Sequence, residues 1–103
     1  MPMYALFLAI DFRVPTSQSL KSKRSVTRSL VRRIDQLHGV GAAEVGSQNS
    51  WQRSQVSAAI VGADASQADT LADSVERLVW GEPQLEVVEI QRTWAEVEKP
   101  FSL

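Results

Sequence analysis

Cysteine is absent from the 103-residue chain, and histidine occurs once, at His38. Without cysteine the chain has no disulfide, thiolate nucleophile or thiolate-bound metal, and one histidine excludes a histidine-rich metal site. The longest apolar run, residues 3–10, is far shorter than the roughly 20 residues that span a bilayer, and it lacks the charged flank of a secretory signal. We therefore expect a cytoplasmic protein that uses neither a metal nor a cofactor.

Sequence motifs of catalysis are also lacking. Residues 14–18, between the first expected strand and helix, contain no glycine, so they cannot form a glycine-rich phosphate loop. No Walker-type sequence occurs, and no serine and aspartate are placed beside His38 for a hydrolytic triad. We expect His38 to lie near the last carbonyls of a helix, and we expect the chain not to be an enzyme.

Hydrophobic periodicity predicts six elements in the order βαββαβ. Alternating or concentrated apolar side chains predict strands at residues 4–13, 40–46, 52–63 and 85–94. Helical spacing predicts a helix at residues 20–38, between an N-cap at Ser19 and a stop at Gly39, and a second helix between Asp64 and Gly81. Asp64 and Gln67 form a capping box.

This order of elements predicts an α+β ferredoxin-like fold. The four strands form one antiparallel sheet, and right-handed crossovers place both helices on one face of it. A single domain is expected over residues 1–94, followed by a C-terminal tail at residues 95–103.

The sheet face away from the helices is expected to be apolar and small. It carries Ala5, Phe7 and Ala9 on the first strand and Ala59 and Val61, or the alternate set, on the third. A face open to water would be more polar, so we expect a cover. The cover is either another copy of the chain or the tail with Trp94 and Phe101. Aromatic side chains are too few here for an RNA-recognition motif.

Charge is balanced overall, at a formal net −1, but it is unevenly placed. Residues 1–53 contain eight basic and three acidic side chains, a net charge of +5. Residues 54–103 contain three basic and nine acidic side chains, a net charge of −6. This asymmetry indicates an anionic partner or self-association of opposite faces. Chance placement on solvated helix faces is the alternative.

Basic side chains dominate the helix expected at residues 20–38. At about 100° per residue, four of them fall within about 80° of one another, and Asp35 is the only acid of the helix. Like charges four residues apart and cations in the first turn both oppose helix stability. With nearby serine hydroxyls and free backbone N–H groups, they favour an anion site. The stripe is Lys21, Arg24, Arg28 and Arg32; Lys23 and Arg33 flank it; the serines are Ser17, Ser19 and Ser22.

Two interpretations of this helix stay open. It binds nucleic acid or another anion, or it is a solvated surface on which Lys23 pairs with Asp11 or Glu44. Trp51 and Arg53 have two interpretations as well. They stack on a base or pack on a partner, or Trp51 seals the end of the core, which is the interpretation we favour.

Three short runs resemble one family. Residues 19–26 read Ser-Leu-Lys-Ser-Lys-Arg-Ser-Val, residues 43–45 Ala-Glu-Val and residues 51–53 Trp-Gln-Arg. Together they resemble the YlxP-like family of small bacterial proteins, a domain-of-unknown-function group. The resemblance implies a ferredoxin-like fold and a role linked to RNA or the ribosome. The chain departs from the family at Ser22 and Asn49, where an acid is usual.

We therefore predict a non-enzymatic protein that binds RNA or a ribosomal particle through the first helix. The expected contacts are Lys21, Lys23, Arg24, Arg28 and Arg32, with Trp51 and Arg53 near the edge. The alternative is a homo-oligomeric protein-interaction or regulatory ligand-binding module that uses Ala5, Phe7, Ala9, Ala59 and Val61.

Overall fold

The computed structural model describes residues 3–47 and 50–97 of the chain. Six elements follow one another in the predicted order. They are β1 (Met3–Arg13), α1 (Leu20–Asp35), β2 (Val40–Gly46), β3 (Arg53–Gly62), α2 (Ala65–Trp80) and β4 (Glu86–Val97). No helix in this part of the chain is long and apolar enough to cross a membrane.

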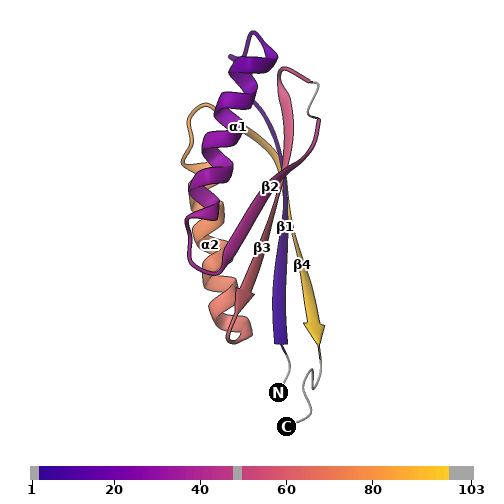
Figure 1. Ribbon diagram of the computed structural model, residues 1–103, viewed down its shortest axis with the longest axis vertical. Coiled ribbons are helices and arrows are strands. Elements are labelled where there is room, and N and C mark those ends of the chain that lie inside the picture. Colours follow the sequence, from indigo (N-terminus) through magenta and orange to yellow (C-terminus); the bar gives the residue numbers. More distant parts are fainter. Residues whose placement is uncertain (1–2, 48–49, 98–103) are drawn as a thin grey trace.

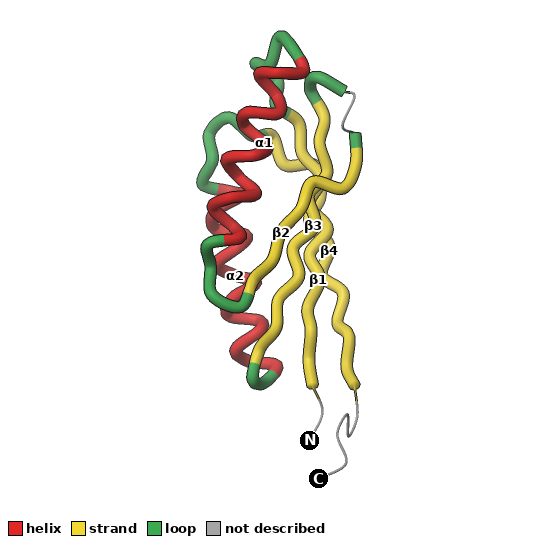
Figure 2. The backbone as a smooth tube through the Cα atoms, viewed as in Figure 1, coloured by secondary structure: helices red, strands yellow, loops and turns green. Residues whose placement is uncertain are grey.

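The four strands form one antiparallel sheet in the order β2-β3-β1-β4. β1 and β3 are central, as predicted, and β2 and β4 are the edges. Both helices lie on one face of the sheet (Figure 1), and the tube view shows the other face without a helix (Figure 2). This is the predicted ferredoxin-like α+β fold. We call the face without helices the open face.

The core lies between the sheet and the two helices. Alternate residues of β1 point into it, and α1 and α2 contribute residues at helical spacing, because a strand repeats every two residues and a helix every 3.6. Each large apolar side chain fully buried here contributes about 1.5–3 kcal/mol. The buried residues include Leu6, Leu8, Ile10 and Phe12 of β1, Leu30 and Ile34 of α1, Val56 and Ile60 of β3, and Val75 and Val79 of α2.

Helix α1 ends at Asp35, three residues before the predicted end at His38. The chain tightens after Asp35: the backbone N–H of Leu37 donates to the carbonyl of Ile34 at 3.0 Å. Gly39 then adopts a φ of +83°, a conformation that favours glycine. His38 consequently lies exposed in this turn rather than within the helix.

Strand β4 continues to Val97, so residues 95–97, predicted to belong to the tail, are part of the sheet. Its last residues pair with the start of β1, with Met3 opposite Val97 and Ala5 opposite Ala95. The long first strand thus offers pairing partners that the local sequence of β4 does not reveal. Residues 98–103, including Phe101, lie outside the described residues.

Trp94 does not cover the open face, so the expectation that it helps to form a cover there is wrong. It pairs with Leu6, whose side chain points into the core, so Trp94 lies on the helix face of the sheet. Its ring meets that of Tyr4 edge-on, with centroids 6.3 Å apart.

Candidate nucleic-acid interface

Four basic side chains of α1 form the cationic row: Lys21, Arg24, Arg28 and Arg32. Arg24 is partly exposed, and the other three are exposed. The salt bridges of residues 3–47 and 50–97 include no carboxylate within 4.0 Å of any of the four. Within the described ranges, no ion pair therefore neutralises these four charges.

Lys23 does not belong to this surface, and its prediction as an anion contact is wrong. Its side chain is 0 % exposed and points toward the sheet. Its Nζ donates to the carbonyl of Ser47 at 2.9 Å and lies 3.6 Å from Oε1 of Glu44. A buried charge is tolerated only with such partners, which makes Lys23 a structural residue.

The contact of Lys23 ties α1 to the hairpin tip, by which we mean Ser47 and residues 50–52 between β2 and β3. The Ser47 carbonyl also accepts the backbone N–H of Ser50 at 3.1 Å, and Ser47 has a φ of 56°. Two donors thus meet on one carbonyl, beside a residue in the left-handed region. The buried ammonium holds the hairpin tip next to the start of α1, at one end of the molecule (Figure 1).

Trp51 projects from this hairpin tip and is 54 % exposed. The preferred interpretation, in which it seals the core, is wrong. An exposed tryptophan offers a flat surface on which a base can stack, which is worth about 1–3 kcal/mol per base. It remains compatible with the predicted contact to nucleic acid.

Arg53, by contrast, is engaged within the chain. Its Nη2 and Nε donate to Oδ2 and Oδ1 of Asp11 at 2.6 and 3.2 Å. The hydrogen bonds from Arg53 lower the pKa of Asp11, and they raise the pKa of Arg53 in turn. Because its guanidinium already holds a carboxylate, Arg53 is less available to a phosphate than the cationic row.

The predicted anion site at the first turn of α1 is largely occupied by the chain itself. The Ser19 side chain caps the helix by accepting the N–H of Ser22 at 3.0 Å. The hydroxyl of Ser17, a buried residue, donates to the Ser19 carbonyl at 3.0 Å. With Lys23 also turned inward, the first turn contributes Lys21 and Arg24 to the surface.

A groove runs between α1 and the edge strand β2, and we call it the edge groove. It has a volume of about 430 Å³ and is lined by Arg28, Val31, Arg32, Asp35 and Glu44. Both of its arginines belong to the cationic row. The row therefore forms one wall of a concave surface rather than a convex ridge alone.

The predicted oligomer contacts lie together on the open face. In β1 and β3 they alternate with buried residues, and Ala5 pairs with Val61 and Phe7 with Ala59. Phe7 is 45 % and Val61 64 % exposed. Met3 and Val97, also exposed, extend the patch. The apolar end of the open face is thus Met3, Ala5, Phe7, Ala59, Val61 and Val97, with Ala9 at its border.

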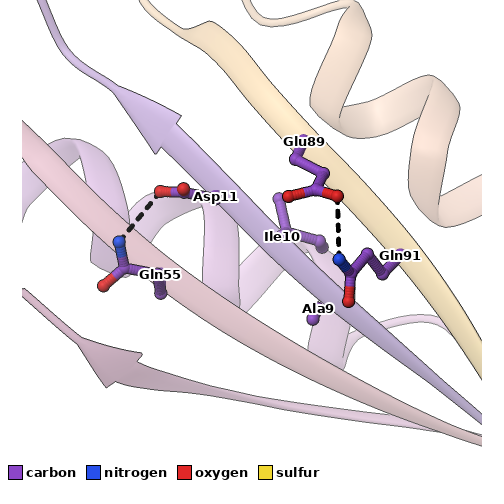
Figure 3. A pocket seen from close by; sticks show the side chains of 6 residues that line it. All are labelled: Ala9, Ile10, Asp11, Gln55, Glu89 and Gln91. Carbon is purple, nitrogen blue, oxygen red and sulfur yellow. Dashed lines mark hydrogen bonds between the residues drawn. The ribbon is translucent and has the colours of Figure 1, made fainter.

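The other end of the open face is polar (Figure 3). A shallow pocket of about 140 Å³ lies there, lined by Ala9, Ile10, Asp11, Gln55, Glu89 and Gln91. Gln55 donates to Asp11, and Gln91 donates to Glu89, each at 2.8 Å. No group of three metal-ligating side chains occurs in residues 3–47 and 50–97.

The sequence model of the family described as "Protein of unknown function (DUF503)" matches residues 6–92, most of the chain. The chain belongs to this family. "Uncharacterized protein YlxP" of Bacillus subtilis (strain 168) is 28 % identical over 76 residues, which cover 74 % of this chain and 83 % of the relative. The predicted YlxP-like resemblance is confirmed. A solved structure, "De novo designed protein Foldit4", covers 86 % of this chain and 96 % of its own, with a TM-score of 0.49 and 20 % identity.

Sequence reasoning missed the edge groove of this DUF503 chain. The sequence identifies Asp35 only as the one acid of the first helix, and Glu44 only as a possible partner of Lys23 and as part of the Ala-Glu-Val run. The available signal was the strand order of the predicted fold, which places residues 40–46 at a sheet edge beside the first helix.

Proposed function

We propose that this DUF503 chain is a non-enzymatic RNA-binding protein of the cytoplasm that contacts ribosomal or other RNA through the cationic row. The row comprises Lys21, Arg24, Arg28 and Arg32, with Trp51 at the hairpin tip as a stacking surface. Lys23 and Arg53, which hold internal partners, support this surface rather than contact the RNA.

The observation that carries the proposal is the difference between paired and unpaired cations. Lys23, Arg33, Arg53 and Arg92 each meet a carboxylate, whereas no member of the cationic row does within the described residues. Unpaired cations aligned on one helix raise the local potential and attract polyanions. Neutralising phosphates releases condensed counterions, which drives binding.

The proposed RNA contact has a defined extent. Lys21 and Arg32 are eleven residues apart, so at 1.5 Å per residue the row extends for roughly 16 Å. This length suits a few consecutive phosphates. The exposed Trp51 favours RNA with an unpaired base near the bound phosphates, because a base must leave its helix to stack on a side chain.

An RNA titration at two salt concentrations tests the proposal. We compare Arg24→Glu and Arg28→Glu with Arg77→Glu, which makes the same change of charge on an exposed position of α2. Each row variant should weaken binding and lower the slope of log K against log salt by about one unit or more, while Arg77→Glu keeps the slope. Equal slopes for all three variants would show that the row contacts no phosphate.

A second candidate function rests on the apolar end of the open face. Phe7 and Val61 expose large apolar surfaces side by side on a sheet that no helix covers in the described structure. Exposed patches of this kind mark interfaces, so self-association is the alternative role. Light scattering over a range of concentrations should then show an oligomer that Phe7→Glu and Val61→Glu each dissociate, without effect on the salt slope of RNA binding.

A further inference from the structure

The two edges of the sheet differ in how they are protected. β4 carries Glu86, Glu89, Arg92 and Glu96 along its length, and charged side chains on an edge discourage the addition of another strand. β2 is made of small or apolar residues apart from Glu44, and Val45 is exposed. A bulge between Glu44 and Gly46 interrupts only its last part. β2 is the edge that can accept a strand.

The backbone of β2 presents hydrogen-bonding groups to the edge groove. The N–H of Val61 donates to the carbonyl of Gly39 at 2.9 Å. Alternate residues of an antiparallel strand bond to the same neighbour, so Gly41 and Ala43 also face β3. Ala42 and Glu44 therefore point their N–H and C=O groups away from β3, toward the groove.

One of these outward groups already holds a carboxylate. The N–H of Ala42 donates to Oδ1 of Asp35 at 3.3 Å, a long hydrogen bond from strand to helix. The outward groups of Glu44 have no partner of this kind among the described side-chain hydrogen bonds. The outward N–H of the edge is thus occupied at Ala42 and available at Glu44.

The acids and the arginines of the edge groove differ in whether they have partners within the chain. Both of its acids are engaged within the chain, Asp35 by Ala42 and Glu44 by Lys23. Neither of its arginines, Arg28 and Arg32, has a carboxylate partner in the described ranges. The groove therefore offers two free guanidinium groups beside free strand backbone.

We propose that β2 accepts an extended acidic segment of a partner protein as a fifth strand. The backbone of that segment pairs with the N–H and C=O of Glu44 and with the carbonyl of Ala42, whose N–H stays with Asp35. Its carboxylates bind Arg28 and Arg32. Such strand addition takes affinity from the main chain and specificity from alternate side chains. Paired guanidinium and carboxylate groups add charge-assisted hydrogen bonds.

Two other occupants fit the groove less well. A second copy paired edge to edge through β2 would bring two α1 helices, and hence two cationic rows, toward each other, which charge repulsion opposes. RNA matches the arginines but not the alternating donors and acceptors of a strand. This proposal does not rest on RNA binding, but both would use Arg28 and Arg32, so the acidic segment and RNA should compete.

The test uses a short blocked peptide in which valine and glutamate alternate, titrated calorimetrically against the full chain. A version with glutamine in place of glutamate tests the charge, and a version with backbone N-methyl groups tests strand pairing. Arg28→Ala combined with Arg32→Ala removes the receiving groups, and Arg77→Ala is the control. Hydrogen exchange of the Glu44 amide reports where the peptide lies.

We expect the glutamine peptide, the N-methylated peptide and the double arginine variant each to weaken binding by about tenfold or more. Arg77→Ala should bind as the parent does, and the peptide should slow exchange at Glu44. Absence of binding up to millimolar peptide would overturn the proposal, as would equal binding of the N-methylated peptide. Protection of Glu44 by RNA but not by peptide would assign the groove to RNA.

Discussion

The two helices lie on the same face of the sheet, but they differ in whether their charged side chains have partners within the chain. On α2, three carboxylates converge on one guanidinium of β4: Arg92 donates to Asp69 at 2.6 Å, to Asp73 at 2.8 Å and to Glu76. On α1, the cationic row meets no carboxylate in the described structure, and its acid, Asp35, serves a backbone N–H of β2.

This contrast separates a structural charge from one that is free for another molecule. Burial lowers the pKa of Arg92, yet its hydrogen bonds to Asp73 and Glu76 outweigh burial, and the net pKa is raised. The acids of α2 are thus tied to the fold. The cationic row of α1 forms no ion pair with the described residues, and like charges four residues apart oppose the helix. This arrangement supports the proposed contact with an external anion.

Lys23 and Arg33 are the cations of α1 that meet a carboxylate, and removal of the buried Lys23 should have the largest effect. Lys23→Ala leaves Glu44 without its cation and a void at a fully buried position. We expect the free energy of unfolding to fall by about 3 kcal/mol, measured by urea denaturation. Arg24→Ala, on the exposed side of the same helix, should change it by less than about 0.5 kcal/mol. Similar values for both variants would contradict the anchoring role of Lys23.

The network of Arg92 should come next. Arg92→Met keeps most of the side-chain volume but leaves three carboxylates near one another without a cation. We expect a loss of about 1–2 kcal/mol in urea denaturation, reduced because two of the acids are more than half exposed. Arg77→Met, which removes a hydrogen bond to Ser74 on the same helix, is the matched control. An unchanged midpoint of urea denaturation for Arg92→Met would mean that the ion pairs of α2 stabilise the fold no more than the unpaired cations of α1 do.

The cationic row should respond in the opposite sense. Arg28 lies four residues from both Arg24 and Arg32, so Arg28→Ala relieves like-charge repulsion. We expect stability to stay the same or to rise by about 0.2–0.5 kcal/mol at low salt, and the gain to vanish at high salt. Denaturation at two salt concentrations measures it. A loss above about 1 kcal/mol would reveal an internal role for Arg28.

The ion pair of Asp11 and Arg53 should give the smallest effect. Because Arg53 lowers the pKa of Asp11 in the folded state, the pair stabilises the fold above the ordinary pKa, and this contribution is lost as the pH falls below about 4. Asp11→Asn should therefore make the acid-induced loss of stability shallower, as followed by circular dichroism. Arg53→Met should act in the same way, and the double variant no further. Additive effects would rule out a shared origin.

Periodicity alone predicted the order of all six elements and their sheet, because buried and exposed residues repeat differently in helices and strands. It was harder to predict which residues of β4 point toward the helices. A bulge in its pairing with β1, between Asp11 and Phe12, places Val87 and Ile90 on one face although they are three residues apart. Such a shift depends on the neighbouring strand, so the side on which Trp94 lies could not be deduced from β4 itself.

The candidate site was predicted only in part, again because some contacts depend on a neighbouring element. The helical angle of Lys23 matches that of Leu30 and Ile34, and its pairing with Asp11 or Glu44 was one of the two interpretations the sequence allowed. The choice between them required Glu44 and Ser47, which come from another element. Whether Trp51 turns toward the core depends on how the hairpin tip bends, which a local pattern does not encode. Contact with RNA stays a prediction.

The anchoring of α1 at both ends has a consequence for recognition. Lys23 fixes its start to the hairpin tip, and the turn at Gly39 fixes its end to β2, where a side chain in place of glycine would come within 3.0 Å of the Val61 carbonyl. The helix backbone is ordered before any partner arrives, so only the arginine and lysine side chains lose freedom, about 1.5–2 kcal/mol each when fully immobilised. For the proposed RNA contact, an ordered helix with mobile charged side chains would fit phosphate backbones of varied shape, which predicts broad binding rather than strict sequence selectivity.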